Sequence, residues 1–253
     1  MAFFNRKPAA PRRYLTPPGQ YYTLYADMLA QPHLLIAGAT GSGKSVVING
    51  LIATALYKGP AQAALILIDP KRVELVSYRD CPHCLRYASE PEEMIQALQD
   101  GLILIEARYR EMQAARIRKY TGGDVFIIVD ELADLLTTNR KQALPLLQRI
   151  AQIGRAASVH LIAATQCPIA KILSTELRVN FDSAVGLHTR SAQDSRNILG
   201  VTGCETLPRY GKGYYLTPEG LRLYTIPMYP EEELDRLAHY WTSAECIAPP
   251  SVR

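Results

Sequence analysis

The sequence has no long apolar run, and its cysteines are few. No stretch approaches the roughly 18 consecutive apolar residues of a membrane-spanning helix, and the N-terminal MAFFNRKPAAPRR lacks the apolar segment of a secretory signal. The five cysteines are an odd number in a chain without an export signal, which favours reduced thiols over a disulfide framework. We therefore expect a cytoplasmic protein with no transmembrane segment, whose attachment to a membrane would require a partner protein.

The first 20 residues contain no acidic residue. They carry four cations and four prolines, and proline excludes a long helix. We predict a basic, proline-rich, extended arm over residues 1–20, followed by one domain over residues 21–253. The arm is either an electrostatic tether for nucleic acid or a solvated tail, and the net charge of +4 permits a polyanionic partner without requiring one.

Short apolar runs alternate with helix-length segments from Pro32 onward, and 48% of the 253 residues are hydrophobic, enough to bury a core. This alternation is typical of βα units with a mainly parallel sheet. The expected strands cover residues 33–38, 64–69, 125–130, 160–165 and 183–188. Near the C-terminus, residues 211–217 and 221–229 flank a turn and predict an antiparallel hairpin, followed by a last helix over 230–241. The predicted fold class is α/β, with helices flanking the sheet.

A long helix is predicted between the second and third strands. Ser89 and Glu92 are spaced as a capping box, with Pro91 in the first turn. Apolar residues then recur at three- and four-residue steps and predict one buried stripe: Met94, Leu98, Leu102, Ile105, Tyr109 and Met112. Cations crowd the second half of this helix and the residues that follow: Arg108, Arg110, Arg116, Arg118 and Lys119. These cations form either a solvated face or a partner surface.

The segment GATGSGKS, residues 38–45, matches the phosphate-binding P-loop pattern at every fixed position, and it stands between a predicted strand and a predicted helix. Its glycines permit a tight turn that aims backbone N–H groups at phosphate oxygens. Lys44 is expected to reach the β- and γ-phosphates of a nucleotide, and the Ser45 hydroxyl is expected to bind Mg²⁺. The predicted nucleotide-binding residues are Arg196, from a later helix, and the residues of this segment: Gly38, Ala39, Thr40, Gly41, Ser42, Gly43, Lys44, Ser45 and Val46.

Polar residues at the ends of other strands complete the predicted site. Asp130 ends the run FIIVD, where parallel sheets place ligands, and is expected to hold the metal. Glu131 follows it and is the candidate general base for the attacking water. Thr165 and Gln166 occupy the same position on another strand and could orient this water or sense the γ-phosphate. Asp69 ends a further strand, and it is either part of the site or a hydrogen-bonded structural residue.

Two arginines could stabilise charge on a transferring phosphoryl group, a role that a neighbouring subunit often supplies in P-loop enzymes. Arg155 follows a predicted helix just before a strand, and Arg196 lies in the predicted helix SAQDSRNIL. Either could instead be an ordinary surface cation. Cys81 and Cys84, with His83 between them, suggest a metal site, but no second ligand pair accompanies them, and we interpret the motif as a coincidence.

Several segments together resemble the motor domain of the FtsK/SpoIIIE family of double-stranded DNA translocases, within the FtsK/HerA group of P-loop ATPases. They occur in the family's order between Pro32 and Pro227: PHLLIAGATGSGKSVVINGLI, LILIDPKRVEL, RYREM, IIVDELADL, GRAASVHLIAATQCP, DSRNILG and GCETLPRYGKGYYL. The resemblance implies a RecA-like core, a homo-hexameric ring, ATP and Mg²⁺ at subunit interfaces, and duplex DNA threaded through the channel.

The resemblance also implies roles for individual residues. Lys44 and Ser45 would contact phosphate and Mg²⁺, and Asp130 and Glu131 would be the acids of hydrolysis. Gln166 would be a sensor of the nucleotide. Arg155 would be the finger that reaches the neighbour's nucleotide, and Arg196 would lie near the channel or the nucleotide.

The chain departs from the family pattern at three basic positions. Cys167 replaces the arginine that follows the Thr-Gln pair, Ala184 replaces an arginine of the next strand, and Ala192 stands where a basic residue precedes the DSR segment, although Arg190 is nearby. These changes leave ATP hydrolysis intact as an expectation and weaken the case for family-like DNA gripping.

Three functions follow from these features. The first is an ATP-driven translocase of double-stranded DNA that serves DNA transfer, conjugation or segregation on a mobile element, plasmid or phage, with a membrane-associated or DNA-processing protein as a further partner. The second is a secretion or assembly ATPase of the same fold that is coupled to a protein and does not grip DNA. The third, a nucleotide-binding module without turnover, is disfavoured by the intact Lys44, Asp130 and Glu131.

Overall fold

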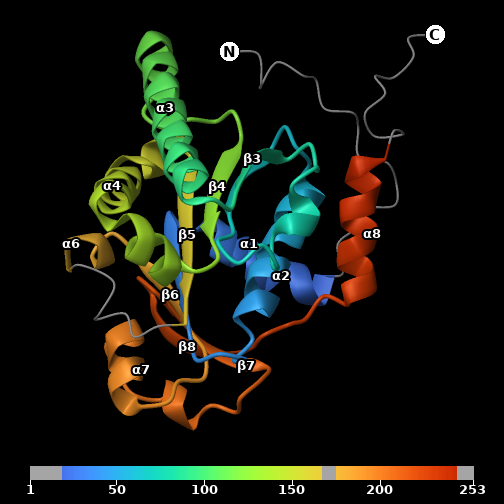
Figure 1. Cartoon of the computed structure of the whole chain (residues 1–253), viewed down its shortest axis with the longest axis vertical. Helices are drawn as coiled ribbons and strands as arrows, with labels where there is room; N and C mark the ends of the chain where they lie inside the picture. Colours follow the sequence, from blue (N-terminus) through green and yellow to red (C-terminus); the bar gives the residue numbers. More distant parts are fainter. Residues whose placement is uncertain (1–18, 167–174, 244–253) are drawn as a thin grey trace.

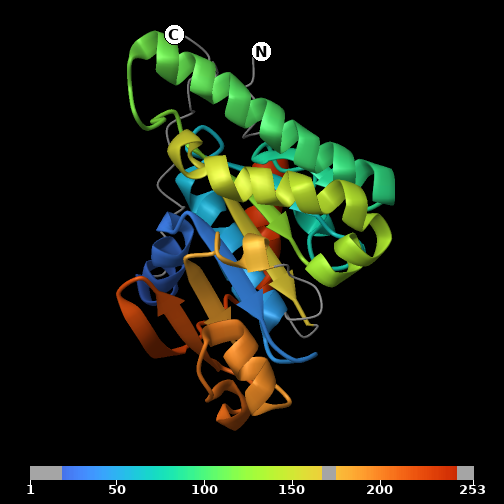
Figure 2. The same ribbon diagram turned by 90° about the vertical axis from the view of Figure 1, so that its left-hand side faces the viewer.

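A mainly parallel sheet with helices on both faces forms the centre of the computed structural model, which describes residues 19–166 and 175–243 (Figures 1 and 2). The strands are β1 (His33–Ala37), β2 (Ala63–Ile68), β3 (Cys84–Ala88), β4 (Asp124–Val129), β5 (Val159–Thr165), β6 (Ser183–Gly186), β7 (Lys212–Thr217) and β8 (Gly220–Thr225). The helices are α1 (Gly19–Ala30), α2 (Lys44–Lys58), α3 (Pro91–Ala115), α4 (Leu132–Ile153), α6 (Thr175–Arg178), α7 (Ala192–Leu199) and α8 (Glu231–Thr242), with short 3₁₀ turns at Val76–Tyr78, Arg155–Ala157 and Cys204–Thr206.

The strand order is β3-β2-β4-β5-β1-β6-β7-β8. All pairs from β3 to β6 are parallel, whereas β7 pairs antiparallel with β6 and β8 antiparallel with β7. The predicted parallel strands are confirmed to within two residues at either end, and so is the C-terminal hairpin. Its second strand ends at Thr225, earlier than predicted, just before Pro227, which has no N–H group to donate to a ladder.

Two elements of five or more residues were not predicted from the sequence, and neither was the four-residue helix α6. The strand β3 lies at one edge of the sheet and is only half-buried, so its residues CLRYA do not form an apolar run. The helix α1 buries Tyr25, Met28 and Leu29. Met28 and Leu29 follow Tyr25 by three and four residues, a helical spacing that the sequence analysis did not use. The predicted arm over residues 1–20 lies almost wholly outside the described residues.

Alternation along the central strands divides the core into two layers. On β4, Val125, Ile127 and Val129 pack under α3 and α4, while Phe126 and Ile128 pack on the opposite face with α1, α2 and α8. Figure 1 shows α3 and α4 on one face of the sheet, with α2 and α8 on the other. Because both faces of the parallel strands are covered, the strands are continuous apolar runs. Within residues 19–166 and 175–243, no helix is long and apolar enough to cross a membrane.

The N-cap of α3 lies one residue later than predicted, at Glu90 instead of Ser89. The capping box is formed by Glu90 and Glu93 rather than by Ser89 and Glu92, with Pro91 at the first helical position. The apolar stripe is confirmed, since four of its members are buried and the other two pack against the core: Met94, Leu98, Ile105 and Met112, with Leu102 and Tyr109.

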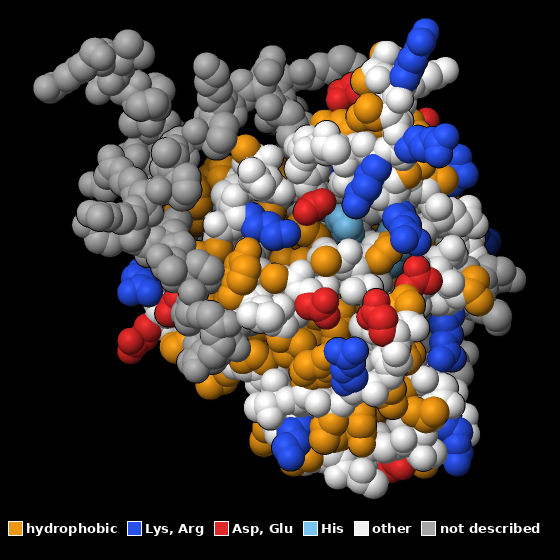
Figure 3. Space-filling model, turned by 180° about the vertical axis from the view of Figure 1, so that it is seen from behind, with side chains coloured by type: hydrophobic (Ala, Val, Ile, Leu, Met, Phe, Trp, Pro, Cys, Tyr) orange, Lys and Arg blue, Asp and Glu red, His pale blue; other side chains and the backbone are white. Residues whose placement is uncertain are grey.

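The cations of α3 do not form one group. Arg108 is buried, with 1% of its surface exposed. The remaining four are exposed: Arg110, Arg116, Arg118 and Lys119. Figure 3 shows Lys and Arg side chains gathered at the upper right, over the end of the molecule toward which α3 projects.

Candidate functional site

The P-loop forms a tight connection between β1 and α2. Gly43 caps α2 with φ at 99°, a left-handed conformation that glycine adopts without strain. A Cβ atom on Gly38 would lie 2.5 Å from the Ser42 Oγ and 2.7 Å from the Leu187 Cβ, so only glycine fits there. The first N–H groups of a helix have no partner within it, which leaves those of Lys44, Ser45 and Val46 for a ligand. All predicted nucleotide-binding residues from Gly38 to Val46 lie on this one turn.

The buried pair of Lys44 and Asp130 joins the P-loop to β4. The Lys44 Nζ lies 2.5 Å from the Asp130 Oδ1 and 2.7 Å from the Asp130 carbonyl oxygen. Both residues are almost fully buried, at 4% and 1% exposed. The second carboxylate oxygen, the Asp130 Oδ2, is also buried and has no hydrogen-bond partner among residues 19–166 and 175–243. A buried, unpaired carboxylate oxygen is costly, and a metal ion or metal-bound water would satisfy it.

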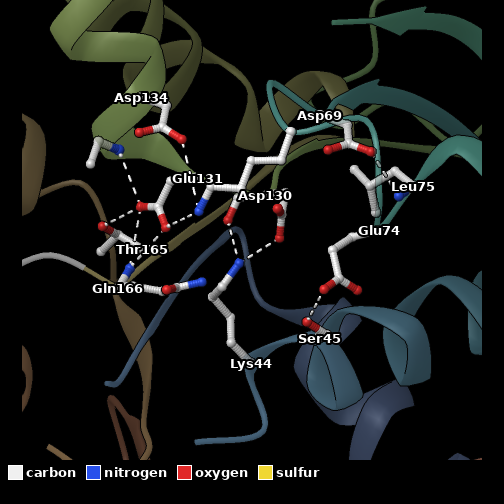
Figure 4. A network of polar contacts seen from close by, with 12 residues as sticks. Lys44, Ser45, Asp69, Glu74, Leu75, Asp130, Glu131, Asp134, Thr165 and Gln166 are labelled. Carbon is white, nitrogen blue, oxygen red and sulfur yellow. Dashed lines mark hydrogen bonds and ion pairs between the residues drawn. The ribbon is translucent and has the colours of Figure 1, made fainter. Parts of the chain in front are cut away.

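The Glu131 carboxylate, at the N-cap of α4, accepts hydrogen bonds from three groups. It accepts hydrogen bonds from the Thr165 Oγ1 at 2.8 Å and from the backbone N–H groups of Gln166 at 3.2 Å and Ala133 at 3.4 Å. The Gln166 side chain in turn accepts a hydrogen bond from the Thr40 hydroxyl of the P-loop at 2.8 Å. The structure thus brings Glu131, Thr165 and Gln166 together beside the phosphate-binding turn, as Figure 4 shows.

The connection after β2 adds residues that the sequence analysis did not single out. The Ser45 Oγ donates a hydrogen bond to the Glu74 Oε1 at 2.6 Å, and the Lys71 Nζ lies 3.5 Å from the Glu131 Oε2 and 3.8 Å from the Asp134 Oδ2. Asp69 is fully buried and accepts backbone hydrogen bonds from this connection, so its role is the structural one of the two considered. Lys71 and Glu74 both lie in the segment DPKRVEL, which the sequence analysis used only for the resemblance to the family.

A pocket of about 340 Å³ opens beside these residues. It is lined by the P-loop and the end of β1, by the connection after β2, by the start of α4, by the residue after β5, and by α7 with the connection before it: Ala37, Gly38, Ala39, Thr40, Lys71, Glu131, Asp134, Gln166, Thr189, Arg190, Asp194 and Ile198. The pocket lies at the carboxyl ends of the parallel strands, where open α/β sheets bind ligands. Arg190, which the sequence analysis mentioned only as a neighbour, is the arginine that lines it.

Arg155 lies at the opposite, amino end of the parallel strands. It is exposed and stands just before β5, whose seven residues span about 20 Å before Thr165 and Gln166 are reached. The turn around it is held firmly, since the buried Arg108 guanidinium donates hydrogen bonds to the Ala157 oxygen at 2.6 Å and the Ser158 oxygen at 2.9 Å. Burial lowers the pKa of Arg108 from its usual value. Because the length of β5 separates Arg155 from the carboxyl ends of the strands, its side chain cannot reach the P-loop of its own chain.

Arg196 is exposed on α7 but does not line the pocket. Asp194 and Ile198, four residues apart on this helix, face the pocket, and Arg196 lies midway between them, toward the other side of the helix. The substituted family positions have different surroundings. Ala184 is buried in the middle of β6, with 4% exposed, and Cys167 lies outside the described residues.

The segment with two cysteines packs in the core. Burial raises the pKa of Cys81 to about 11 and that of Cys84 to about 12, which disfavours the thiolate form that binds metal. Burial also lowers the pKa of His83 to about 3, and its ring packs edge-on against Trp241 with ring centres 4.7 Å apart. In the described ranges, no group of three or more His, Cys, Asp or Glu residues could hold a metal ion.

Comparisons with known proteins match the part of the chain that contains the P-loop, Asp130 and Glu131. A model of the FtsK/SpoIIIE family matches residues 19–125 and 122–170. The chain is 38% identical over 231 residues to the DNA translocase FtsK of Helicobacter pylori strain J99 and 36% identical over 208 residues to that of Borreliella burgdorferi. These alignments cover 85% and 76% of this chain but 27% and 26% of the relatives. The chain thus spans about a quarter of the length of these curated relatives.

Solved structures share the fold. The cytoplasmic domain of the Type VII secretion ATPase EccC from Thermomonospora curvata matches with a TM-score of 0.67 at 25% identity, over 88% of this chain and 30% of that one. The pCW3 conjugation coupling protein TcpA, determined with ATPγS, matches with a TM-score of 0.72 at 20% identity, over 85% of this chain and 66% of that one. The predicted P-loop ATPase fold is confirmed, and the family model extends over more than half of the residues, so the chain belongs to the FtsK/SpoIIIE family.

Proposed function

We propose that this chain is an ATP-driven motor that moves double-stranded DNA, with ATP and Mg²⁺ bound at the interfaces of a homo-hexameric ring. The observation that carries the proposal is the buried pair of Lys44 and Asp130, whose unpaired Oδ2 lies beside a P-loop and next to a firmly held Glu131. DNA transfer, conjugation or segregation on a mobile element, plasmid or phage is the process we infer, from the DNA translocases to which the chain is similar.

The residues of the site suit hydrolysis of a nucleoside triphosphate. The backbone N–H groups of residues 38–46 would bind the phosphates, and the Lys44 ammonium would turn from Asp130 toward the β- and γ-phosphates. Ser45 and Asp130 would hold Mg²⁺, which when bound neutralises charge on the phosphates. Glu131 would accept a proton from the attacking water as the bond between the γ-phosphorus and the bridging oxygen breaks.

Gln166 connects this chemistry to the P-loop. Its backbone N–H donates a hydrogen bond to Glu131, and its side chain accepts one from Thr40. Any shift of Thr40 around the γ-phosphate would therefore be transmitted to the general base. This arrangement supports a sensor role for Gln166. The exposed Arg155 would complete the site of the neighbouring subunit, because its distance from its own P-loop excludes a role there.

A protein-coupled secretion or assembly ATPase is the second candidate. The EccC neighbour is a secretion ATPase, and Ala184 is buried in β6 at a position where the resemblance implies an arginine. DNA remains the favoured substrate, because the curated relatives with higher identity are DNA translocases. A membrane-associated or DNA-processing protein would be a further partner in either case.

The two candidates differ in their response to DNA. We expect steady-state ATP hydrolysis by the purified chain to rise with added linear duplex DNA, and to rise further as the duplex lengthens at constant total base pairs. Because phosphate contacts release counterions, the stimulation should fall steeply with salt. The Lys44→Ala variant serves as the blank. Hydrolysis that is indifferent to DNA at low salt would contradict translocation and favour the protein-coupled candidate.

A further inference from the structure

Glu74 occupies a central place in the site, although neither the P-loop nor the strand-end pattern includes it. Its Oε1 accepts a hydrogen bond from the Ser45 hydroxyl at 2.6 Å, the same hydroxyl that P-loop enzymes use to bind Mg²⁺. Lys44, the preceding residue, contacts the Asp130 carboxylate at 2.5 Å. Two carboxylates from the connections after two different strands, β2 and β4, therefore contact consecutive residues in the first turn of α2, as Figure 4 shows.

The connection that carries Glu74 is held in a fixed shape. The buried Asp69 accepts hydrogen bonds from the backbone N–H groups of Arg72 at 2.9 Å and Leu75 at 3.0 Å. Arg72 has a positive φ of 58°, a conformation that costs a non-glycine residue about 1 kcal/mol or more. Leu75 is fully buried, whereas Val73 is 69% exposed. The chain thus turns sharply between two anchors and directs Glu74 inward.

Asp130 has one carboxylate oxygen that remains unsatisfied. Its Oδ2 is buried and has no hydrogen-bond partner in the described part of the chain, while its Oδ1 contacts the Lys44 ammonium. Within the described residues, the Glu74 carboxylate accepts a hydrogen bond from the Ser45 hydroxyl and forms no ion pair with a lysine or arginine. Lys44 balances the charge of Asp130, and Lys71 contacts Glu131 and Asp134, so neither lysine contacts the negative charge of Glu74 next to Ser45. Hard oxygen donors with excess negative charge suit a divalent cation that retains several waters.

We propose that Glu74 is a second acidic residue of the metal site, beside Asp130. It holds the Ser45 hydroxyl when no metal is bound and accepts hydrogen bonds from metal-bound water when the metal is present. The proposal rests on the proposed function, because it assumes that Ser45 and Asp130 hold Mg²⁺ with the nucleotide. Glu74 acts on the metal through water and leaves Ser45 free to bind the ion directly. The connection after β2 is then a wall of the catalytic site as well as a link in the fold.

A different role for Glu74 would predict the opposite change in metal affinity when Glu74 is replaced. If Glu74 only blocked the empty site by holding Ser45, its removal would strengthen metal binding. If Glu74 orients metal-bound water, its removal should weaken metal binding about 10-fold, the lower range for residues that support a metal from outside its direct ligands. Glu74→Gln is the informative change, because the amide oxygen still accepts the Ser45 hydrogen bond while the charge is lost.

The experiment is a Mn²⁺ titration of the full chain in the presence of ATPγS, followed by electron paramagnetic resonance of free Mn²⁺. We expect Glu74→Gln and Glu74→Ala to bind Mn²⁺ about 10-fold more weakly than the unchanged chain. Binding of ATPγS in EDTA should be unchanged or tighter, because a negative charge near the phosphates is removed. Glu106→Gln, an exposed position on α3, is the matched control and should leave Mn²⁺ binding unchanged.

The outcomes separate this inference from the proposed function. Equal or tighter Mn²⁺ binding by Glu74→Gln, when the unchanged chain binds Mn²⁺ with ATPγS and Lys44→Ala does not, overturns the role of Glu74 alone. Failure of the unchanged chain to bind Mn²⁺ with ATPγS overturns both proposals. Weakened binding by Glu74→Ala with an unchanged thermal unfolding curve supports the inference, because a misfolded variant would melt differently.

Discussion

Replacing Lys44 by alanine is expected to abolish ATP hydrolysis, with kcat lowered by about 10³-fold or more. Lys44 is 4% exposed and is the cation that the structure places against Asp130 at the start of α2. Without it, charge that develops on the transferring phosphoryl group would lose its stabilisation within the P-loop. Steady-state phosphate release measures the loss, and Lys58→Ala on the same helix is the control, since Lys58 is partly exposed and pairs with Asp124 instead.

The same change should also destabilise the nucleotide-free protein. Removing one member of a buried ion pair leaves the other charge unpaired, at a typical cost of about 3–5 kcal/mol. A second change, Asp130→Asn, should restore much of that stability in the Lys44→Ala background without restoring hydrolysis. Thermal unfolding and phosphate release, measured on both variants, separate the two effects. Normal turnover by Lys44→Ala would contradict the assignment of the site.

The sequence predicted the site well where local geometry determines it. The P-loop is contiguous, and its spacing requires a strand before it and a helix after it, so Lys44 and Ser45 could be placed without a structure. Asp130 and Glu131 were identifiable because polar residues that end a buried strand of a parallel sheet face the ligand-binding edge. These predictions depend on periodicity and on a single motif, both of which are properties of short segments.

Contacts between distant segments could not be predicted in this way. Glu74 reaches Ser45 across 29 positions of sequence, and the connection that brings it there depends on Asp69 and on the backbone turn at Arg72. Arg108 was grouped with surface cations, because the α3 pattern does not reveal that its guanidinium reaches the turn before β5. Side-chain reach and the register of neighbouring strands decide these contacts, and neither is contained in helical or strand periodicity.

The position of Arg155 makes its contribution testable between subunits. It stands at the end of β5 remote from the P-loop, on a turn fixed by Arg108, and its side chain is exposed. An arginine finger supplied by a neighbour raises kcat by about 10³-fold or more, so Arg155→Ala should lower kcat by at least that factor while nucleotide binding persists. Arg110→Ala, an exposed arginine on α3, is the control and should leave kcat unchanged.

Mixed rings test whether Arg155 acts on the adjacent subunit. Subunits with Glu131→Gln have an inactive site and an intact Arg155, whereas subunits with Arg155→Ala have an intact site and no finger. In rings assembled from equal amounts of both, about one interface in four combines the intact site with the intact finger, so activity should reappear on mixing. If Arg155 acted within its own chain, every subunit would be defective and mixing would restore nothing. Restoration therefore requires both an interface role for Arg155 and an assembly in which subunits share their sites.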